Sequence, residues 1–78
     1  MDVIFLKLNQ LGIGDKAIIS YIVESDLTRR LKDIGILKGN TIECVYESPF
    51  SDPRVYLIKG AFFSIRNCDA STVIVEVI

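Results

Sequence analysis

Side chains able to carry chemistry are few in this sequence, and their types argue against catalysis. Histidine is absent, and the two cysteines, Cys44 and Cys68, stand far apart in the chain. A cysteine nucleophile needs a neighbouring base to form its thiolate, and the usual base is missing. We therefore expect Cys44 to be a small core residue, Cys68 to lie in a polar turn, and the chain not to be an enzyme.

Metal binding has little support from the residue pattern. No paired-cysteine spacing of the kind that holds structural zinc is present. Cys68 stands beside Asp69, and such a pair can meet a soft metal, although a turn residue without any ligand is the ordinary explanation. We assign no metal site and expect at most a weak association with Fe(II) or another divalent transition metal.

Two charged groupings each leave two interpretations open. Glu43 and Glu47 are four residues apart, so on a strand they share one face, either as a paired-acid site or as a solvated surface. Arg29, Arg30 and Lys32 lie close together, either as an anion site or as the wet side of an amphipathic helix. Neither grouping decides the function on its own.

The loop at residues 48–54 is the strongest candidate for a binding site. Phe50 stands between Pro49 and Ser51, with no sequence-level reason to be buried, although it also fits as a plug for one end of a barrel. An aromatic side chain and an arginine on a restrained loop are typical anchors of protein interfaces. If the barrel closes so that this loop lies next to the arginine pair, the partner-binding site consists of Arg29, Arg30, Phe50, Asp52 and Arg54.

Hydrophobic periodicity predicts the elements that must position these residues. Strands are expected at residues 16–23, 41–47, 54–59, 61–66 and 72–78, with a hairpin turn at Gly60 and one helical turn at residues 67–71. Alternation places Ala17, Ile19, Tyr21 and Val23 on one face of the first of these strands and makes Ile42, Cys44 and Tyr46 the core face of the second.

One short helix is expected over residues 25–34, after the first long strand. Ser25 or Asp26 can cap its start, and Gly35 fits the left-handed position that ends many helices, with Ile36 packing back on the helix. The spacing of its apolar residues predicts a stripe that plugs the barrel, formed by Leu27, Leu31 and Ile34.

Composition bounds the class of protein. The chain has 78 residues, half of them hydrophobic, with a net charge of -1, which predicts one folded domain over residues 1–78 and argues against nucleic-acid binding. The N-terminal apolar run is too short for a signal peptide, and no segment is long enough to insert into a membrane. A cytoplasmic protein with reduced thiols is expected. About five regularly spaced strands indicate a mainly β fold, a small barrel without edge strands.

An ordered pattern of residues resembles the FeoA family, ferrous iron transport protein A. The similarity runs from about residue 8 to residue 77 and is carried by Leu8, Leu11, Gly14, Arg30-Leu31-Lys32-Asp33-Ile34-Gly35-Ile36, Gly39, Pro49, Asp52-Pro53, Gly60, Ile65-Arg66, Ala70, Val73 and Val75. The sequence departs from the family at Phe50-Ser51, where relatives commonly carry small or glycine residues, and at Cys68, where charged residues are usual.

The resemblance implies a fold and a partner. The fold is an SH3-like barrel, and the function is a cytosolic accessory role in ferrous iron uptake, exerted by binding FeoB, a membrane transporter with a GTPase domain. Transition-metal binding is also implied, although no ligand cluster is visible here. Similar domains form the C-terminal part of iron-dependent repressors, so the alternative is a metal-responsive sensory or dimerisation domain. In either case we expect a monomer or a weak dimer.

Overall fold

The computed structural model describes residues 2–26 and 28–78. Within these residues, one antiparallel sheet is formed by the strands β1 (Phe5–Lys7), β2 (Lys16–Ile22), β3 (Thr41–Glu47), β4 (Arg54–Ile58), β5 (Ala61–Ile65) and β6 (Val73–Val77). Three short helices connect the strands: the 3-10 helix η1 (Leu8–Gln10), α1 (Arg29–Asp33) and α2 (Asn67–Ala70). The mainly β prediction is confirmed, and each predicted strand is present.

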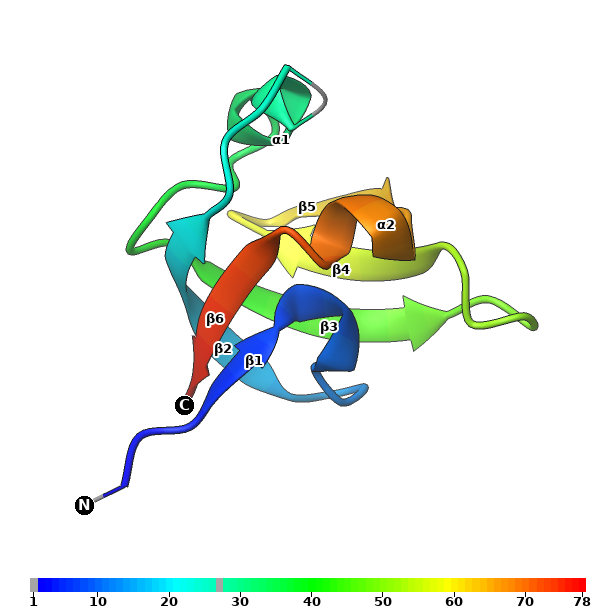
Figure 1. Ribbon diagram of the computed structural model, residues 1–78. Coiled ribbons are helices and arrows are strands. Elements are labelled where there is room, and N and C mark those ends of the chain that lie inside the picture. The colour runs from blue at the N-terminus through cyan, green and yellow to red at the C-terminus, as the bar shows by residue number, and fades with distance from the viewer. Residues whose placement is uncertain (1, 27) are drawn as a thin grey trace.

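The sheet has the order β1-β6-β2-β3-β4-β5 and folds over on itself (Figure 1). The strands β1, β6 and β2 run steeply across the view, whereas β3, β4 and β5 cross them nearly horizontally. This is an SH3-like arrangement, as expected. Two details of the prediction are corrected: there are six strands because β1 was missed, and no pairing joins the end strands β1 and β5 within the described residues, so the barrel is not closed.

Irregular pairing reverses the expected side of two tyrosines. Between Cys44 and Tyr46 the register of β3 against β4 shifts, and a similar shift lies between Ile19 and Tyr21 on β2. A bulge adds one residue to a strand, and because side chains alternate with a period of two, the residues beyond it exchange faces. Cys44 is buried as predicted and Ile19 is buried too, but both tyrosines, expected on the same faces as these residues, are exposed.

The core lies on the inner face of this curved sheet. Its fully buried members come from both halves of the sheet and from the flanking helices, so the folded-over halves enclose one continuous apolar cluster. It contains Leu8, Leu11, Ala17, Ile19, Leu31, Ile36, Ile42, Cys44, Tyr56, Ile58, Ile65, Ala70, Val73 and Val75.

The helix α1 is shorter than predicted but is anchored to this core. Leu31 is buried and Ile34 packs partly against the cluster, whereas Leu27 lies outside the described residues. Gly35 has a φ of 102°, and the amide of Ile36 donates to the carbonyl of Leu31 at 3.0 Å, so the expected helix end is confirmed. The start differs from the prediction, because among the residues that the structure describes no side chain caps α1.

Candidate functional site

The most exposed large apolar side chain of the described residues is at the tip of the loop between β3 and β4. This loop, residues 48–53, is called the Phe50 loop below. It extends away from the sheet at the right of Figure 1, and Phe50 is 91% exposed. The interpretation of Phe50 as a plug for a barrel end is therefore wrong, and its alternative, a surface aromatic available to another molecule, remains.

Hydrogen bonds fix the shape of the Phe50 loop. The amide of Ser51 donates to the carbonyl of Ser48 at 2.8 Å, and the amide of Ser48 donates to the carbonyl of Pro53 at 3.3 Å. Asn67, the first residue of α2, donates twice to the loop: its amide to Asp52 Oδ1 at 2.9 Å and its Nδ2 to the carbonyl of Ser51 at 2.8 Å. A loop held in one conformation loses little entropy when it binds a partner.

Arg54 supports the Phe50 loop from inside the protein. Its side chain, at the start of β4, is only 6% exposed, so little of it reaches the outer surface. Its Nη1 donates to the carbonyl of Asn9 at 2.8 Å, and its Nη2 lies 3.8 Å from Glu47 Oε2. Such pairing is what a buried guanidinium requires. Arg54 thus joins the end of the loop to η1.

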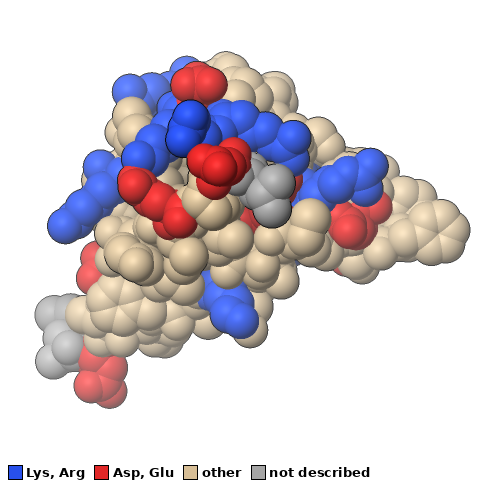
Figure 2. Space-filling view, turned by 45° about the horizontal axis from the view of Figure 1, so that its top comes forward, with Lys and Arg blue, Asp and Glu red and all other residues tan. Residues whose placement is uncertain are grey.

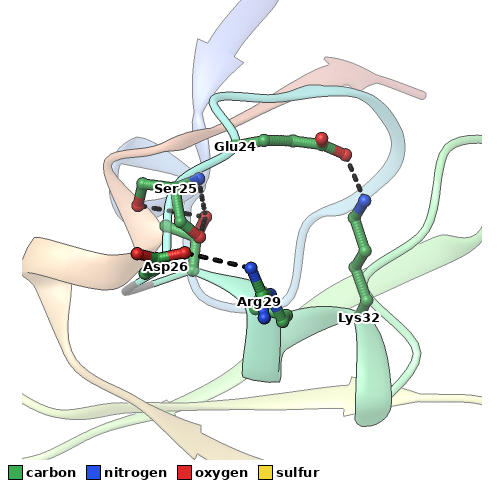
Figure 3. A pocket seen from close by; sticks show the side chains of 6 residues that line it. Glu24, Ser25, Asp26, Arg29 and Lys32 are labelled. Carbon is green, nitrogen blue, oxygen red and sulfur yellow. Dashed lines mark hydrogen bonds and ion pairs between the residues drawn. The ribbon is translucent and has the colours of Figure 1, made fainter.

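The basic residues of α1 are each matched by a carboxylate. Arg29 Nη2 lies 3.0 Å from Asp26 Oδ1, Lys32 pairs with Glu24, and these side chains line a pocket beside the helix (Figure 3). The hydrogen bond and positive charge of Lys32 lower the pKa of Glu24. Figure 2 shows blue and red side chains interleaved over the end of the molecule that carries α1, a mixed surface unlike an anion site.

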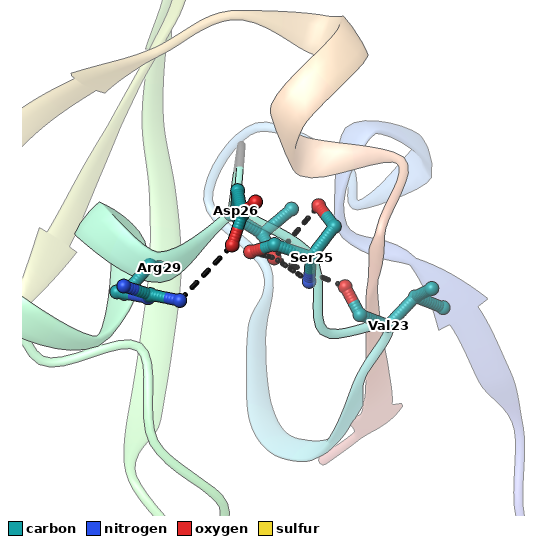
Figure 4. Close-up of polar contacts among 5 residues, drawn as sticks. Val23, Ser25, Asp26 and Arg29 are labelled. Carbon is teal, nitrogen blue, oxygen red and sulfur yellow. Dashed lines mark hydrogen bonds and ion pairs between the residues drawn. The ribbon is translucent and has the colours of Figure 1, made fainter.

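A buried threonine organises the turn that leads into α1. The hydroxyl of Thr28 donates to the carbonyl of Val23 at 3.1 Å and accepts a hydrogen bond from the amide of Ser25 at 2.9 Å (Figure 4). The carboxylate of Asp26 reaches Arg29 instead of a helix amide. Ser25 and Asp26, the expected caps, therefore bond to Thr28 and Arg29 instead of capping the helix. Thr28 holds the segment after β2 against the helix.

The two thiols lie in different surroundings. Cys44 is buried, which raises the pKa of its thiol, and Cys68 is exposed on α2. No group of three or more His, Cys, Asp or Glu residues that could hold a metal exists among residues 2–26 and 28–78. Glu43 lies opposite Lys16 in the register of β3 against β2, whereas Glu47 Oε2 lies 3.8 Å from Arg54 Nη2.

The structure brings together only part of the predicted binding site. Phe50 and Asp52 lie on one loop with Arg54 buried beneath it, but Arg29 and Arg30 are on α1, which Figure 1 shows at a different end of the molecule. The expected closeness of the loop and the arginine pair is wrong, because it relied on a closed barrel. Two asparagines beside the loop, Asn9 and Asn67, were missed, since nothing in the sequence marks them.

The fold and this surface define a small SH3-like domain whose prominent features are an exposed aromatic on a fixed loop and a helix of paired charges. Within the described part of the chain, no helix is long and apolar enough to cross a membrane. The FeoA domain family matches residues 6–77. The chain therefore belongs to the FeoA family, as the sequence pattern predicted.

Two named proteins are similar to this chain. The Fe(2+) transport protein A/Fe(2+) transporter FeoB fusion protein of Porphyromonas gingivalis (strain ATCC BAA-308 / W83) is 34% identical over 74 residues, 94% of this chain but only 9% of the relative. The solution structure of iron(II) transport protein A from Clostridium thermocellum is 32% identical with a TM-score of 0.88, covering 94% of this chain and 46% of the other.

A repressor structure shares the fold alone. It is described as a manganese-dependent transcriptional repressor and has a TM-score of 0.85 at 18% identity, covering all of this chain and 44% of the other. At this identity, the likeness supports the architecture and carries no information about the activity of the chain.

Proposed function

We propose that this protein is a cytoplasmic accessory protein of ferrous iron uptake, that it acts by binding the cytosolic part of an FeoB-type transporter, and that it is not an enzyme. The observation that carries the proposal is the relative in which a similar domain is fused to a transporter named FeoB. Domains that work together are often joined in one chain in one organism and associate non-covalently in another. The transporter's GTPase domain is the expected site of contact.

Two surfaces supply the proposed contact. The first is the Phe50 loop, where Phe50 is the anchor and Asp52 holds the loop to α2 through the amide of Asn67. Exposed aromatics on fixed loops contribute strongly to binding because little order is lost on association. Arg54 contributes indirectly, because its buried side chain supports the loop from inside the protein.

The second surface is the exposed side of α1, with Arg29 and Arg30. Each arginine is paired within the chain, to Asp26 and to Asp69 respectively. Both arginine side chains are mostly exposed, so partner carboxylates can approach them, which would affect the rate and orientation of association more than its strength. The pairing of the basic residues of α1 with carboxylates from outside the helix also supports the proposal that nucleic acid is not the partner.

The remaining parts of the proposal concern the state of the protein. One continuous core supports a single domain over residues 1–78. We propose a monomer or weak dimer without direct membrane insertion, with Fe(II) or another divalent transition metal bound weakly at most.

A titration tests the proposed partner. Uniformly 15N-labelled protein is titrated with the cytosolic domain of an FeoB-type transporter from the same organism, and backbone amide signals are followed by NMR. Saturable shifts in the Phe50 loop and in α1 are expected, with β1 unaffected as an internal control. Absence of shifts, or shifts confined to β1 and β6, would overturn the proposal.

A second candidate is a metal-responsive sensory or dimerisation domain. The observation that favours it is the exposed Cys68 beside Asp69. However, Asp69 already accepts a hydrogen bond from Arg30 at 2.6 Å. Calorimetry with Fe(II) or Mn(II) under reducing conditions separates the candidates, because stoichiometric heat at micromolar concentrations is expected only for the sensor.

A further inference from the structure

A groove runs between the Phe50 loop and the segment that follows β1. It has a volume of about 310 Å³, and Asn9, Ile13, Glu47, Arg54 and Asn67 are among the residues that line it. This volume lies at the lower end of the range of about 300–1,000 Å³ found for ligand sites. The groove is distinct from the exposed tip of the loop, because it lies against buried polar side chains.

Three polar atoms of the groove residues are buried without a hydrogen-bond partner among the described residues. They are Arg54 Nε, Asn67 Oδ1 and Asn9 Oδ1. Burial of an unpaired polar group is costly, so each such group in a folded protein needs an explanation. Arg54 is more than nine-tenths buried; its Nη1 donates to Asn9 and its Nη2 lies near Glu47, whereas Nε–H has no partner and can donate to a ligand.

The chemistry of these atoms selects the kind of ligand. Nε–H of Arg54 can only donate, and Asn67 Oδ1 can only accept, because Nδ2 of the same amide is fixed by its bond to the carbonyl of Ser51. An anion would meet Glu47 and the amide oxygen, and a cation would meet the guanidinium. A neutral group that offers both an acceptor and a donor satisfies the groove, and the peptide group is the commonest such group in proteins.

We propose that this groove binds a peptide group from an extended segment of the partner protein. The carbonyl of that segment accepts from Arg54 Nε–H, and its N–H donates to Asn67 Oδ1. The amide of Asn9 presents both a donor and an acceptor to the next peptide group, and exposed Ile13 offers an apolar contact at the rim. The identity of the partner, the cytosolic part of the transporter, rests on the proposed function; the chemistry of the groove does not.

Two variants form a matched pair for the test. Asn9 and Ser48 each have a buried side-chain oxygen without a partner, but only Asn9 lines the groove. Asn9→Ala is expected to weaken binding of the transporter's cytosolic domain about three- to tenfold, the loss of one hydrogen bond. Ser48→Ala is expected to leave the dissociation constant unchanged. Both should keep the amide spectrum of the native fold.

The side-chain signal of Arg54 gives a direct readout. In 15N-labelled protein, the Nε–H signal of Arg54 should shift and exchange more slowly with solvent when the transporter domain binds. If the domain binds but this signal stays unchanged and Asn9→Ala binds like the native protein, the groove inference is overturned while the proposed function stands.

A small probe tests the groove in the case where the transporter domain does not bind. N-acetylalanine methylamide, which carries two peptide groups, is titrated into the protein alone, with N-acetylalanine methyl ester as the control that lacks one N–H. A saturable shift of the Arg54 Nε–H signal with the amide, weaker with the ester, supports the groove even if the transporter domain does not bind. No saturable shift with either probe overturns the inference.

Discussion

The carboxylate of Asp69 accepts a hydrogen bond of 2.6 Å from the guanidinium of Arg30 and so joins α2 to α1 across 39 residues of sequence. The carboxylate is sheltered, with 15% of the side chain exposed, whereas the arginine side chain is 72% exposed. A helix as short as α1 is not stable alone and depends on such tertiary contacts. The pair therefore ties the two helices together at the surface of the same core.

Replacing Arg30 should lower the stability of the fold measurably. Arg30→Gln is expected to lower the free energy of unfolding by about 0.5–1 kcal/mol, and less at high salt, because the attraction is screened. The control is Arg29→Gln, whose partner Asp26 is fully in solvent, so its effect should be nearly zero. Urea denaturation followed by circular dichroism checks both. Equal losses for the two variants would contradict the structural role of the pair.

The hydroxyl of Thr28 should contribute more to the free energy of unfolding than the hydroxyl of Ser25. Thr28→Val keeps the shape of the side chain but removes the bonds to Val23 and Ser25. Because Thr28 is buried, we expect a loss of about 1–2 kcal/mol in the free energy of unfolding. Ser25→Ala, which removes only a 3.4 Å contact to Thr28, should change the value by less than about 0.5 kcal/mol. A larger loss for Ser25→Ala would show that the turn is organised differently.

The two glycines that follow α1, Gly35 and Gly39, make another matched pair. Gly35 and Gly39 have φ values of 102° and 93°, but a Cβ at Gly35 would lie 3.1 Å from Ile58 Cγ2, whereas one at Gly39 meets nothing within 4 Å. Gly39→Ala should cost about 1–2 kcal/mol from backbone strain alone. Gly35→Ala should cost more, since the buried isoleucine must also move. Thermal unfolding measures the difference, and equal costs would exclude a role for Ile58.

Local patterns in the sequence predicted five strands because each of these has enough alternating or β-branched residues to show the two-residue period of a strand. The turn at Gly60 and the helix end at Gly35 followed from positive φ, which the structure confirms. The strand β1 was missed because three residues show no period. The bulges that expose Tyr21 and Tyr46 depend on the pairing of distant strands and leave no local signal.

The candidate site was predictable only where it depends on local sequence. The sequence placed Phe50 on a loop with two prolines but left its exposure open between a surface aromatic and a plug. The burial of Arg54 was not predicted, since it arises from a contact with Asn9, 45 residues earlier. The distance between the Phe50 loop and α1 depends on how the sheet curves, which is a property of the whole fold. The asparagines of the groove carry no pattern and become recognisable only when their neighbours are in place.

Stability should fall at high pH because of one tyrosine. Burial raises the pKa of Tyr56 to about 12, with nearby Arg54 opposing the change. An unfolded chain loses this proton near pH 10, so the stabilisation is complete below about pH 10 and is lost as the pH rises to about 12, amounting to about 2–3 kcal/mol.

The variant Tyr56→Phe isolates this contribution, because the lysines titrate alike in both proteins. At neutral pH it should be slightly less stable, since it lacks the hydrogen bond to the carbonyl of Leu8. Above about pH 11 the order should reverse, which urea denaturation at several pH values would reveal. Parallel curves for the two proteins across the whole range would contradict the assignment of the effect to Tyr56.

Removal of the aromatic ring at the tip of the Phe50 loop should affect binding without affecting folding. Phe50 is 91% exposed and Phe62, on the edge strand β5, is 68% exposed, so alanine at either position should change the free energy of unfolding by less than about 0.5 kcal/mol. If Phe50 is the anchor of the proposed interface, Phe50→Ala should raise the dissociation constant for the transporter's cytosolic domain about tenfold or more. Phe62→Ala should leave it unchanged, as calorimetry can measure. Equal weakening by both substitutions would indicate a general loss of apolar surface, and weakening by Phe62→Ala alone would move the interface to the edge of the sheet.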